Sequence, residues 1–526
     1  GRSLWGDEAK LALNLVNRTY PELFQVLDYD QVAPVGFLLV EKAIAQMFGT
    51  SEAALRLLPL LAGIGALGVA YALARRVLSP VAVPIALAFI ACSDRLVYYA
   101  SELKPYALDV FLTLVILTYA TFNPKTITRA QAIRAVAIGA IAVWFSYPAV
   151  FALAGAGLFS TLSALLSSWS DPKKQRGQAD AALPVAHEAI AGSGGTGTAT
   201  LTPVVSPEKP KPRWRHTLLV CFAWALSFLL FYLVSVQGNT GNSTLQESWG
   251  SRRAFPAALP DLDWLFYSLK RMFEKPLSFP PPVLQYLAIV TWLVGSVAFF
   301  RRGRPAAYGL LMSPLIMSLL AAYLNKYPFY SRLIVFLVPP FAMVIAEGLA
   351  FLLRQRWPVA IGSVVLAIGL LYLPVTTSAR TLITPRVDED IRPLMGYVQD
   401  NWQPGDLLYV FEKSKFQFRF YAPEYEFEPE DYVIGIDAED LGVRDAADVR
   451  SLFREDLRAL CGEARVWLLV ADISVRRDTE IMLDLMGRLG QRRERVEAGG
   501  LSSFVDRYDL SACGPVALAR SLQHRQ

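Results

Sequence analysis

Short polar groups in this sequence carry residue types that suit chemistry on a hydroxylated or charged substrate. The first is Trp5-Gly6-Asp7-Glu8, which places two carboxylates side by side. A carboxylate can act as a general base by taking the proton of an attacking hydroxyl group. The alternative interpretation is structural, because Asp7 precedes a helical pattern and suits the N-cap position of that helix. Both interpretations stand at the level of the residues.

A second group, Asp28 to Pro34, precedes the apolar segment 34–48. Asp30 in such a loop can face a substrate, and Asp30 with Pro34 can equally frame a turn. The apolar segment is too short to span a bilayer. Its adjacent charges, Glu41 and Lys42, favour a helix that lies in the membrane interface.

A third group runs from Tyr98 to Tyr106 and contains Glu102 and Lys104. Glu102 can bind sugar hydroxyls or assist a base, and Lys104 can hold a phosphate as a point charge. Tyr99 and Tyr106 can line a binding site, and they also fit the aromatic belt of a membrane protein. The two charges can equally be boundary charges.

A fourth group, 325–332, offers the cations Lys326 and Arg332. They can grip a lipid phosphate, or they can simply anchor a helix end by snorkelling. The histidines lie outside all four groups, and the cysteines show no metal-binding spacing. We therefore predict no metal ligands and no cofactor, and the residues leave a divalent metal requirement open.

Membrane helices must position these groups, because apolar runs dominate residues 52–374. The chain has 526 residues, of which 54% are hydrophobic and 18% are charged, whereas soluble domains carry about 25% charged residues. A membrane-spanning helix needs about 20 mainly apolar residues. The sequence predicts ten spans, at 52–74, 80–93, 105–121, 132–147, 148–168, 216–236, 282–300, 305–323, 333–351 and 357–374.

Basic residues orient the predicted bundle. If the spans alternate, most Lys and Arg clusters between spans fall on one side, which the positive-inside rule makes cytoplasmic. Basic residues in 237–281 oppose this weakly, since acidic residues accompany them. The other side then holds 1–51, 94–104, 237–281, 324–332 and the tail. Because this places Gly1 outside, we expect a further span upstream of it.

Residues 375–526 have the composition of a soluble domain, and 171–212 that of a flexible cytoplasmic linker. The tail alternates strand patterns with helix patterns and so predicts a small α/β domain. The strands are expected at 406–411, 465–471 and 502–509, and the helices at 388–402, 446–460 and 478–490. Cys461 and Cys513 can form a disulfide there, if their Cα atoms lie within about 7 Å. The predicted fold is mainly α: a polytopic bundle over 1–374 with a C-terminal α/β domain.

The order of these motifs resembles the GT-C superfamily, especially the bacterial glycosyltransferase family 39 proteins related to protein O-mannosyltransferases. The resemblance is carried by LWGDEA at 4–9, DQVAPVGFLLVEK at 30–42, FGTSEAALRLLPLLAG at 48–63, YYASELKPYALDV at 98–110 and YPFYSRLIVFLVPP at 327–340. It implies a GT-C-type bundle with an active site on the outer face and a dolichyl- or polyprenyl-phosphate sugar donor. It also implies that Asp7 is the catalytic base, with Glu8 beside it, and that Glu102, Lys104 and Tyr106 form the family's acidic-basic-aromatic motif. Lys104 stands where relatives often have Arg, and Val35 where they often have Pro.

Together these features predict an inverting membrane glycosyltransferase of hexosyl or mannosyl type, in a bacterial plasma membrane. Its partners would be membrane lipid, the polyprenyl-phosphate donor and a protein, lipid or glycan acceptor. The net charge of +5 is small and no basic arm is present, so nucleic acid is not expected. A transporter or lipid flippase is the alternative, and a non-catalytic scaffold presenting the tail is a third option. The polar groups gather on one face, which favours an interfacial enzyme over a pore.

Overall fold

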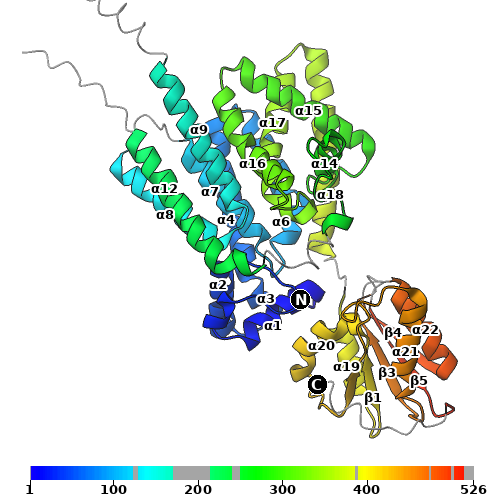
Figure 1. The fold of residues 1–526 in the computed structure, drawn as a ribbon. Helices are drawn as coiled ribbons and strands as arrows, with labels where there is room; N and C mark the ends of the chain where they lie inside the picture. The colour runs from blue at the N-terminus through cyan, green and yellow to red at the C-terminus, as the bar shows by residue number, and fades with distance from the viewer. Residues whose placement is uncertain are drawn as a thin grey trace, which may run out of the picture. The chain divides into compact units, whose positions relative to one another are not determined.

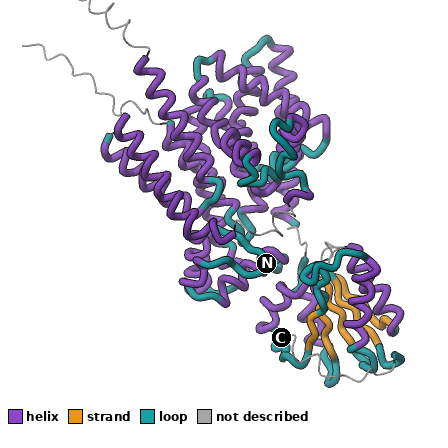
Figure 2. The backbone as a smooth tube through the Cα atoms, in the orientation of Figure 1, coloured by secondary structure: helices purple, strands orange, loops and turns teal. Residues whose placement is uncertain are grey.

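The computed structural model describes residues 2–121, 128–169, 214–239, 249–384, 389–472, 476–498 and 503–513. The predicted linker at 171–212 lies outside these residues. Figure 2 shows helices along most of the described chain and strands in its tail. Backbone contacts divide the chain into two compact units. The composite unit comprises Gly1–Leu60, Ala100–Lys104 and Thr376–Gln526, and the bundle unit comprises Leu61–Tyr99 and Pro105–Val375.

The bundle unit is built from helices (Figure 1). They are α4 (Leu57–Val77), α5 (Ala82–Ala91), α6 (Asp94–Tyr99), α7 (Tyr106–Ala120), α8 (Arg129–Phe145), α9 (Ala149–Trp169), α12 (Trp214–Phe231), η3 (Tyr232–Val236), η4 (Gln237–Asn239), α14 (Leu262–Glu274), α15 (Pro282–Arg301), α16 (Pro305–Tyr323), η5 (Ser331–Leu337), α17 (Val338–Leu353) and α18 (Trp357–Ile383). The first residues of α4, 57–60, and the last residues of α18, 376–383, belong to the composite unit.

Each predicted span contains a helix, and within the described residues six helices are long and apolar enough to cross a membrane. These six are Leu57–Val77, His216–Val236, Pro282–Arg301, Pro305–Tyr323, Ser331–Leu353 and Trp357–Ile383. The first begins later than the predicted 52–74, because the short helix α3 (Glu52–Leu55) ends before Arg56. The last continues past the predicted end at 374, since the helix runs through Pro374. The chain is an integral membrane protein.

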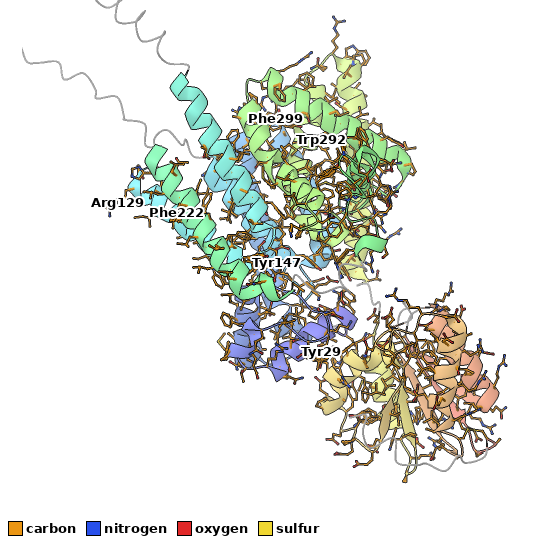
Figure 3. The ribbon with its side chains drawn as sticks, viewed as in Figure 1. Tyr29, Arg129, Tyr147, Phe222, Trp292 and Phe299 are labelled. Atoms are coloured by element: carbon orange, nitrogen blue, oxygen red, sulfur yellow. A yellow bond between two sulfur atoms is a disulfide. The ribbon has the colours of Figure 1, made fainter. Side chains whose placement is uncertain are left out.

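Small residues allow α15 and α17 to cross in backbone contact. A Cβ atom added to Gly295 would lie 1.9 Å from the carbonyl oxygen of Val344, and one added to Gly348 would lie 2.2 Å from that of Thr291. Beside the crossing, Trp292 stacks on Phe341 with ring centroids 5.4 Å apart, and Figure 3 labels Trp292 on α15. Close backbone approach of this kind is a main source of helix association in lipid.

The carboxylate of Glu347, on the apolar helix α17, is only 1% exposed. It accepts a hydrogen bond from the Ser79 amide at 2.8 Å and forms an ion pair with Arg302. A buried charge is tolerated when it is paired and hydrogen-bonded in this way. Glu347 therefore links three segments of the bundle.

The composite unit joins the first 60 residues to the tail. Its first part contains α1 (Gly6–Asn17), η1 (Pro21–Phe24), α2 (Val35–Phe48) and α3. Its tail contains α19 (Arg392–Asp400), β1 (Leu407–Val410), η6 (Glu412–Ser414), α20 (Lys415–Tyr421), η7 (Ala422–Glu424), β2 (Tyr432–Ile434), α21 (Ala446–Arg458), β3 (Val466–Val470), α22 (Arg476–Leu489), β4 (Gln491–Glu497) and β5 (Phe504–Asp509).

The α2 helix confirms the helix predicted at 34–48, but its two charges are not displayed at the surface. Glu41 is fully buried, and burial raises the pKa of its carboxyl group to about 9. Lys42 is buried as well and donates a hydrogen bond to the backbone oxygen of Leu15 at 2.8 Å. The charge pair therefore does not mark an exposed polar face of the helix.

The tail is a small α/β domain, as predicted. Its sheet has the strand order β2-β1-β3-β5-β4, with β1 parallel to β2 and β3, and with β5 antiparallel to β3 and β4. The helices α21 and α22 pack on one face of the sheet, where Phe453 and Met482 contact a core that includes Leu468 (Figure 1). The prediction missed β2, which is only three residues long, and β4, because the sequence QRRERVE lacks the apolar alternation that indicates a strand.

The predicted disulfide is confirmed. Cys461 and Cys513 are bonded, and their Cα atoms lie 5.2 Å apart. Two backbone hydrogen bonds support the same junction, from the Gly462 amide to Leu510 and from the Leu510 amide to Glu463. The bond ties the segment after α21 to the segment after β5.

Replacing Gly295 with Ala should destabilise the bundle by about 1–3 kcal/mol, the usual cost of overpacking. The reason is that the new methyl group would overlap the Val344 carbonyl, so the helices must separate. Thermal unfolding of the detergent-solubilised protein would measure the change. Gly362→Ala on α18 is the matched control, because a Cβ there meets no atom within 4 Å. Equal midpoints for the two variants would show that the close crossing is not required.

Candidate active site

Asp7 lies in the first turn of α1. The helix begins at Gly6 with Trp5 at the N-cap position, so the interpretation of Asp7 as the N-cap is wrong. A carboxylate in the first turn is favoured by the positive end of the helix dipole. The side chain of Asp7 is half-buried, whereas its neighbour Glu8 is fully buried. The two adjacent carboxylates therefore have different environments.

Glu8 anchors three segments of the composite unit. Its Oε1 accepts hydrogen bonds from the Leu103 amide at 2.7 Å and from Arg56 Nε at 2.9 Å. Its Oε2 accepts a second bond from Arg56 Nη2 at 2.6 Å. Two-point pairing of guanidinium with carboxylate is the strong form of this interaction. Glu8, predicted from the sequence as a catalytic candidate, is thus engaged in holding α1 to the residue after α3 and to the 100–104 loop.

Glu52 and Arg56 stand four residues apart, a spacing that predicts a local ion pair, but Arg56 does not pair with Glu52. That spacing pairs side chains only along a continuous helix, and α3 ends at Leu55. Arg56 instead binds Glu8, while Glu52 pairs with Arg392 of the tail at 2.7 Å. Desolvation would raise the pKa of Glu52, but hydrogen bonds from its own backbone and Tyr421, with the charge of Arg392, hold that pKa below its ordinary value.

The second and third sequence groups meet through Lys104. Its Nζ donates a hydrogen bond to Gln31 Oε1 at 2.7 Å, and both side chains are buried. Two residues that precede Gln31, Tyr29 and Asp30, have φ angles of 62° and 54°. This left-handed conformation is costly for residues other than glycine, and such strain often persists at functional sites. Asp30 is exposed on this loop.

The structure therefore brings together three of the predicted groups. Asp7, Glu8, Asp30, Glu102 and Lys104 all belong to the composite unit. Glu102 is buried, with 1% of its surface exposed. Sequence reasoning missed Gln31 as the partner of Lys104. The sequence indicated Gln31 only by its position within the second group. The remaining predicted residues, Tyr99, Tyr106, Lys326 and Arg332, belong to the bundle unit.

In the bundle unit, cations and aromatic rings gather around Trp249 and Tyr330. The guanidinium groups of Arg252 and Arg332 lie 5.3 and 5.9 Å from the Trp249 ring centroid. Arg271 lies 4.7 Å from the Tyr330 ring and donates a hydrogen bond to its hydroxyl at 2.8 Å. Cation–π contacts hold such groups in place without neutralising their charge. This cationic cluster (Trp249, Arg252, Arg271, Tyr330 and Arg332) extends the predicted fourth group.

The predicted tyrosines of the bundle unit are also in contact. The rings of Tyr99 and Tyr106 meet edge to face with centroids 5.0 Å apart, and both are largely buried. Lys326, in contrast, is exposed. Within the described residues, no group of three or more His, Cys, Asp and Glu side chains is arranged to hold a metal ion.

Bundle and tail define the class of protein: an integral membrane protein that carries a small α/β domain. No protein-family model and no curated protein matches the sequence. Among solved structures, the chain is similar to ArnT from Cupriavidus metallidurans bound to undecaprenyl phosphate, with 13% identity, a TM-score of 0.49 and coverage of 98% of this chain and 96% of that chain. It is also similar to the Archaeoglobus fulgidus oligosaccharyltransferase in complex with zinc and sulfate, with 13% identity, a TM-score of 0.46 and coverage of 97% and 70%.

Replacing Glu8 with Gln should destabilise the protein by about 3–5 kcal/mol, because it leaves the Arg56 charge buried without its partner. Thermal unfolding would measure the effect. Asp28→Asn is the matched control, since Asp28 pairs with Arg18 while 54% of its side chain is exposed, and exposed pairs contribute less than about 1 kcal/mol. If Glu8→Gln cost no more than Asp28→Asn, the anchoring role of Glu8 would be refuted.

Proposed function

We propose that this chain is a membrane glycosyltransferase that moves a sugar from a polyprenyl-phosphate donor to an acceptor hydroxyl, with inversion. The observation that carries the proposal is the anchoring of α1 by Glu8 to the Leu103 amide at 2.7 Å. Asp7 therefore belongs to the same compact unit as Glu102, Lys104 and the loop that contains Gln31. A potential base, a phosphate-binding cation and sugar-binding groups are thus held in one unit.

Asp7 is the general base in this proposal. A phosphate is already a competent leaving group, so the reaction chiefly needs a group that accepts the proton of the acceptor hydroxyl. Adjacent residues on a helix point about 100° apart, and Glu8 is turned inward to Arg56. Asp7 is the less buried carboxylate of the pair, and we assign the base to it. Glu8 becomes a positioning residue, and Glu102 assists the base.

The donor phosphate and sugar are proposed to use the remaining residues. The proposed phosphate-binding cations are Lys104 of the composite unit and Lys326 and Arg332 of the bundle unit. Arg332 also belongs to the cationic cluster. The aromatic rings of that cluster restrict the guanidinium groups, which lowers the entropy cost of binding an anion. Asp30, Tyr99 and Tyr106 contact the sugar and the lipid.

The proposed location is a bacterial plasma membrane, with the active site and the tail on the extracytoplasmic side. The disulfide between Cys461 and Cys513 supports this side for the tail, because disulfides persist in oxidising compartments. The distribution of basic loops supports the same orientation. The proposed sugar is a hexose, such as mannose, and the acceptor a protein, lipid or glycan.

Asp7→Asn should lower donor turnover by about 10²- to 10⁴-fold, the range for loss of a general base. The substitution keeps the shape of the side chain, so expression and donor binding should change little. Turnover with purified polyprenyl-phosphate sugar and acceptor would be measured, with Asp28→Asn as the active control. Near-full turnover of Asp7→Asn with loss in Glu102→Gln would mean that the base is misassigned. Full activity of both Asp7→Asn and Glu102→Gln would contradict the proposed reaction.

Lys104→Ala and Arg332→Ala should each weaken donor binding about tenfold or more, because a charged hydrogen bond contributes about 1.5–3 kcal/mol. Equilibrium binding of the polyprenyl-phosphate sugar would report the change. Arg354→Ala removes an exposed cation elsewhere in the bundle unit and should leave affinity unchanged. Wild-type affinity in both site variants would exclude them from the phosphate site and direct attention to Arg252 and Arg271.

A further inference from the structure

The helix that presents Asp7 begins without a capping side chain at its N-cap position. The first backbone amides of any α-helix lack partners within the helix. Ser, Thr, Asp or Asn at the N-cap usually supplies an oxygen to one of them. Here the N-cap residue is Trp5, whose side chain has no oxygen. The missing acceptor must therefore come from elsewhere.

The tail supplies it. Oε2 of Glu389 accepts a hydrogen bond from the Gly6 amide at 2.7 Å, across a separation of 383 residues in sequence. Gly6 is the first residue of α1 and immediately precedes Asp7. A carboxylate at this position also interacts favourably with the positive end of the helix dipole. Glu389 thus caps the Gly6 amide, while the local side chain of Glu8 accepts a longer hydrogen bond from the Trp5 amide at 3.4 Å.

Glu389 is itself held in position. Gln417 of α20 is fully buried, and its Nε2 donates a hydrogen bond to the same Glu389 oxygen at 2.7 Å. The backbone of Glu389 has a φ angle of 147°, which residues other than glycine rarely adopt. Strain of this kind persists only where the surroundings enforce it. The position of the carboxylate is therefore fixed by the fold of the tail.

Neighbouring contacts fasten the same two segments together. Tyr421 of α20 accepts a hydrogen bond from the Leu4 amide at 2.8 Å, and Asp390 accepts one from the Ser3 hydroxyl. Lys10 of α1 lies 4.8 Å from the ring centroid of Phe416. The tail therefore contacts residues before Gly6, namely Ser3 and Leu4, and a residue after it, Lys10.

We propose that Glu389 is a positioning residue for the transfer reaction and that the tail completes the active site by capping the helix that carries Asp7. The inference rests on the proposed function, in which Asp7 is the base. The tail then contributes to the rate without touching the substrate. Loss of the cap lets the first turn of α1 fray, so the carboxylate of Asp7 is misplaced from the acceptor hydroxyl.

Glu389→Ala should lower kcat about tenfold or more, because small misplacements of a reacting group are costly, while donor affinity stays the same. Glu389→Gln keeps an acceptor oxygen for the Gly6 amide and should retain most of the activity. Asp445→Ala is the matched control: it removes a carboxylate that caps α21 through the Ala447 amide at 2.8 Å, and it should leave kcat unchanged.

Amide hydrogen exchange of a peptide covering residues 4–9 provides a readout beside activity, and it should speed up in Glu389→Ala but not in Asp445→Ala. Unchanged exchange and unchanged kcat in Glu389→Ala, with Asp7→Asn inactive, would overturn the positioning role alone. Equal losses in Glu389→Ala and Asp445→Ala would also overturn it, since any lost cap would then suffice. Full activity of Asp7→Asn would overturn the proposed base and this inference together.

Discussion

The buried ion pair between Glu8 and Arg56 is the interaction on which the composite unit depends. A carboxylate with no exposed surface is stable only if its charge is matched and its oxygens are hydrogen-bonded. Arg56 meets that need and also donates to the backbone oxygens of Arg2 and Ser3, at 3.0 and 3.1 Å. Glu8 also accepts hydrogen bonds from the backbone amides of Leu103 and Trp5, at 2.7 and 3.4 Å. One buried charge therefore dictates where α1, the residue after α3 and the 100–104 loop meet.

A second constraint follows from the helix that Glu8 belongs to. Because Trp5 at the N-cap position offers no side-chain oxygen, the acceptor for the Gly6 amide comes from a distant residue, Glu389. The ion pair of Glu52 with Arg392 fastens the same parts of the chain. The first 60 residues and the tail therefore form one compact unit. A catalytic role for Asp7 would accordingly involve the tail, although none of the sequence motifs lies there.

The helices of the bundle were predictable because membrane spanning imposes a length and an apolar composition that appear directly in the sequence. The tail was predictable where strands such as 466–470 are continuously apolar. β4 was not, because an exposed edge strand such as QRRERVE carries charges on both faces. The start of the first span was also misplaced, since a run of apolar residues does not reveal that α3 ends at Leu55.

For the site, the sequence by itself determined which residue types are available: carboxylates at 7, 8, 30 and 102, cations at 104 and 332, and aromatic residues around them. Their order along the chain was enough to suggest a reaction. Only the tertiary structure decided that Glu8 is turned to Arg56, that Lys104 is joined to Gln31 and that the tail caps α1. The physical reason is that burial and pairing of a charge depend on partners tens or hundreds of residues away. Local spacing, as the separation of Glu52 and Arg56 shows, suggests only the nearest candidate.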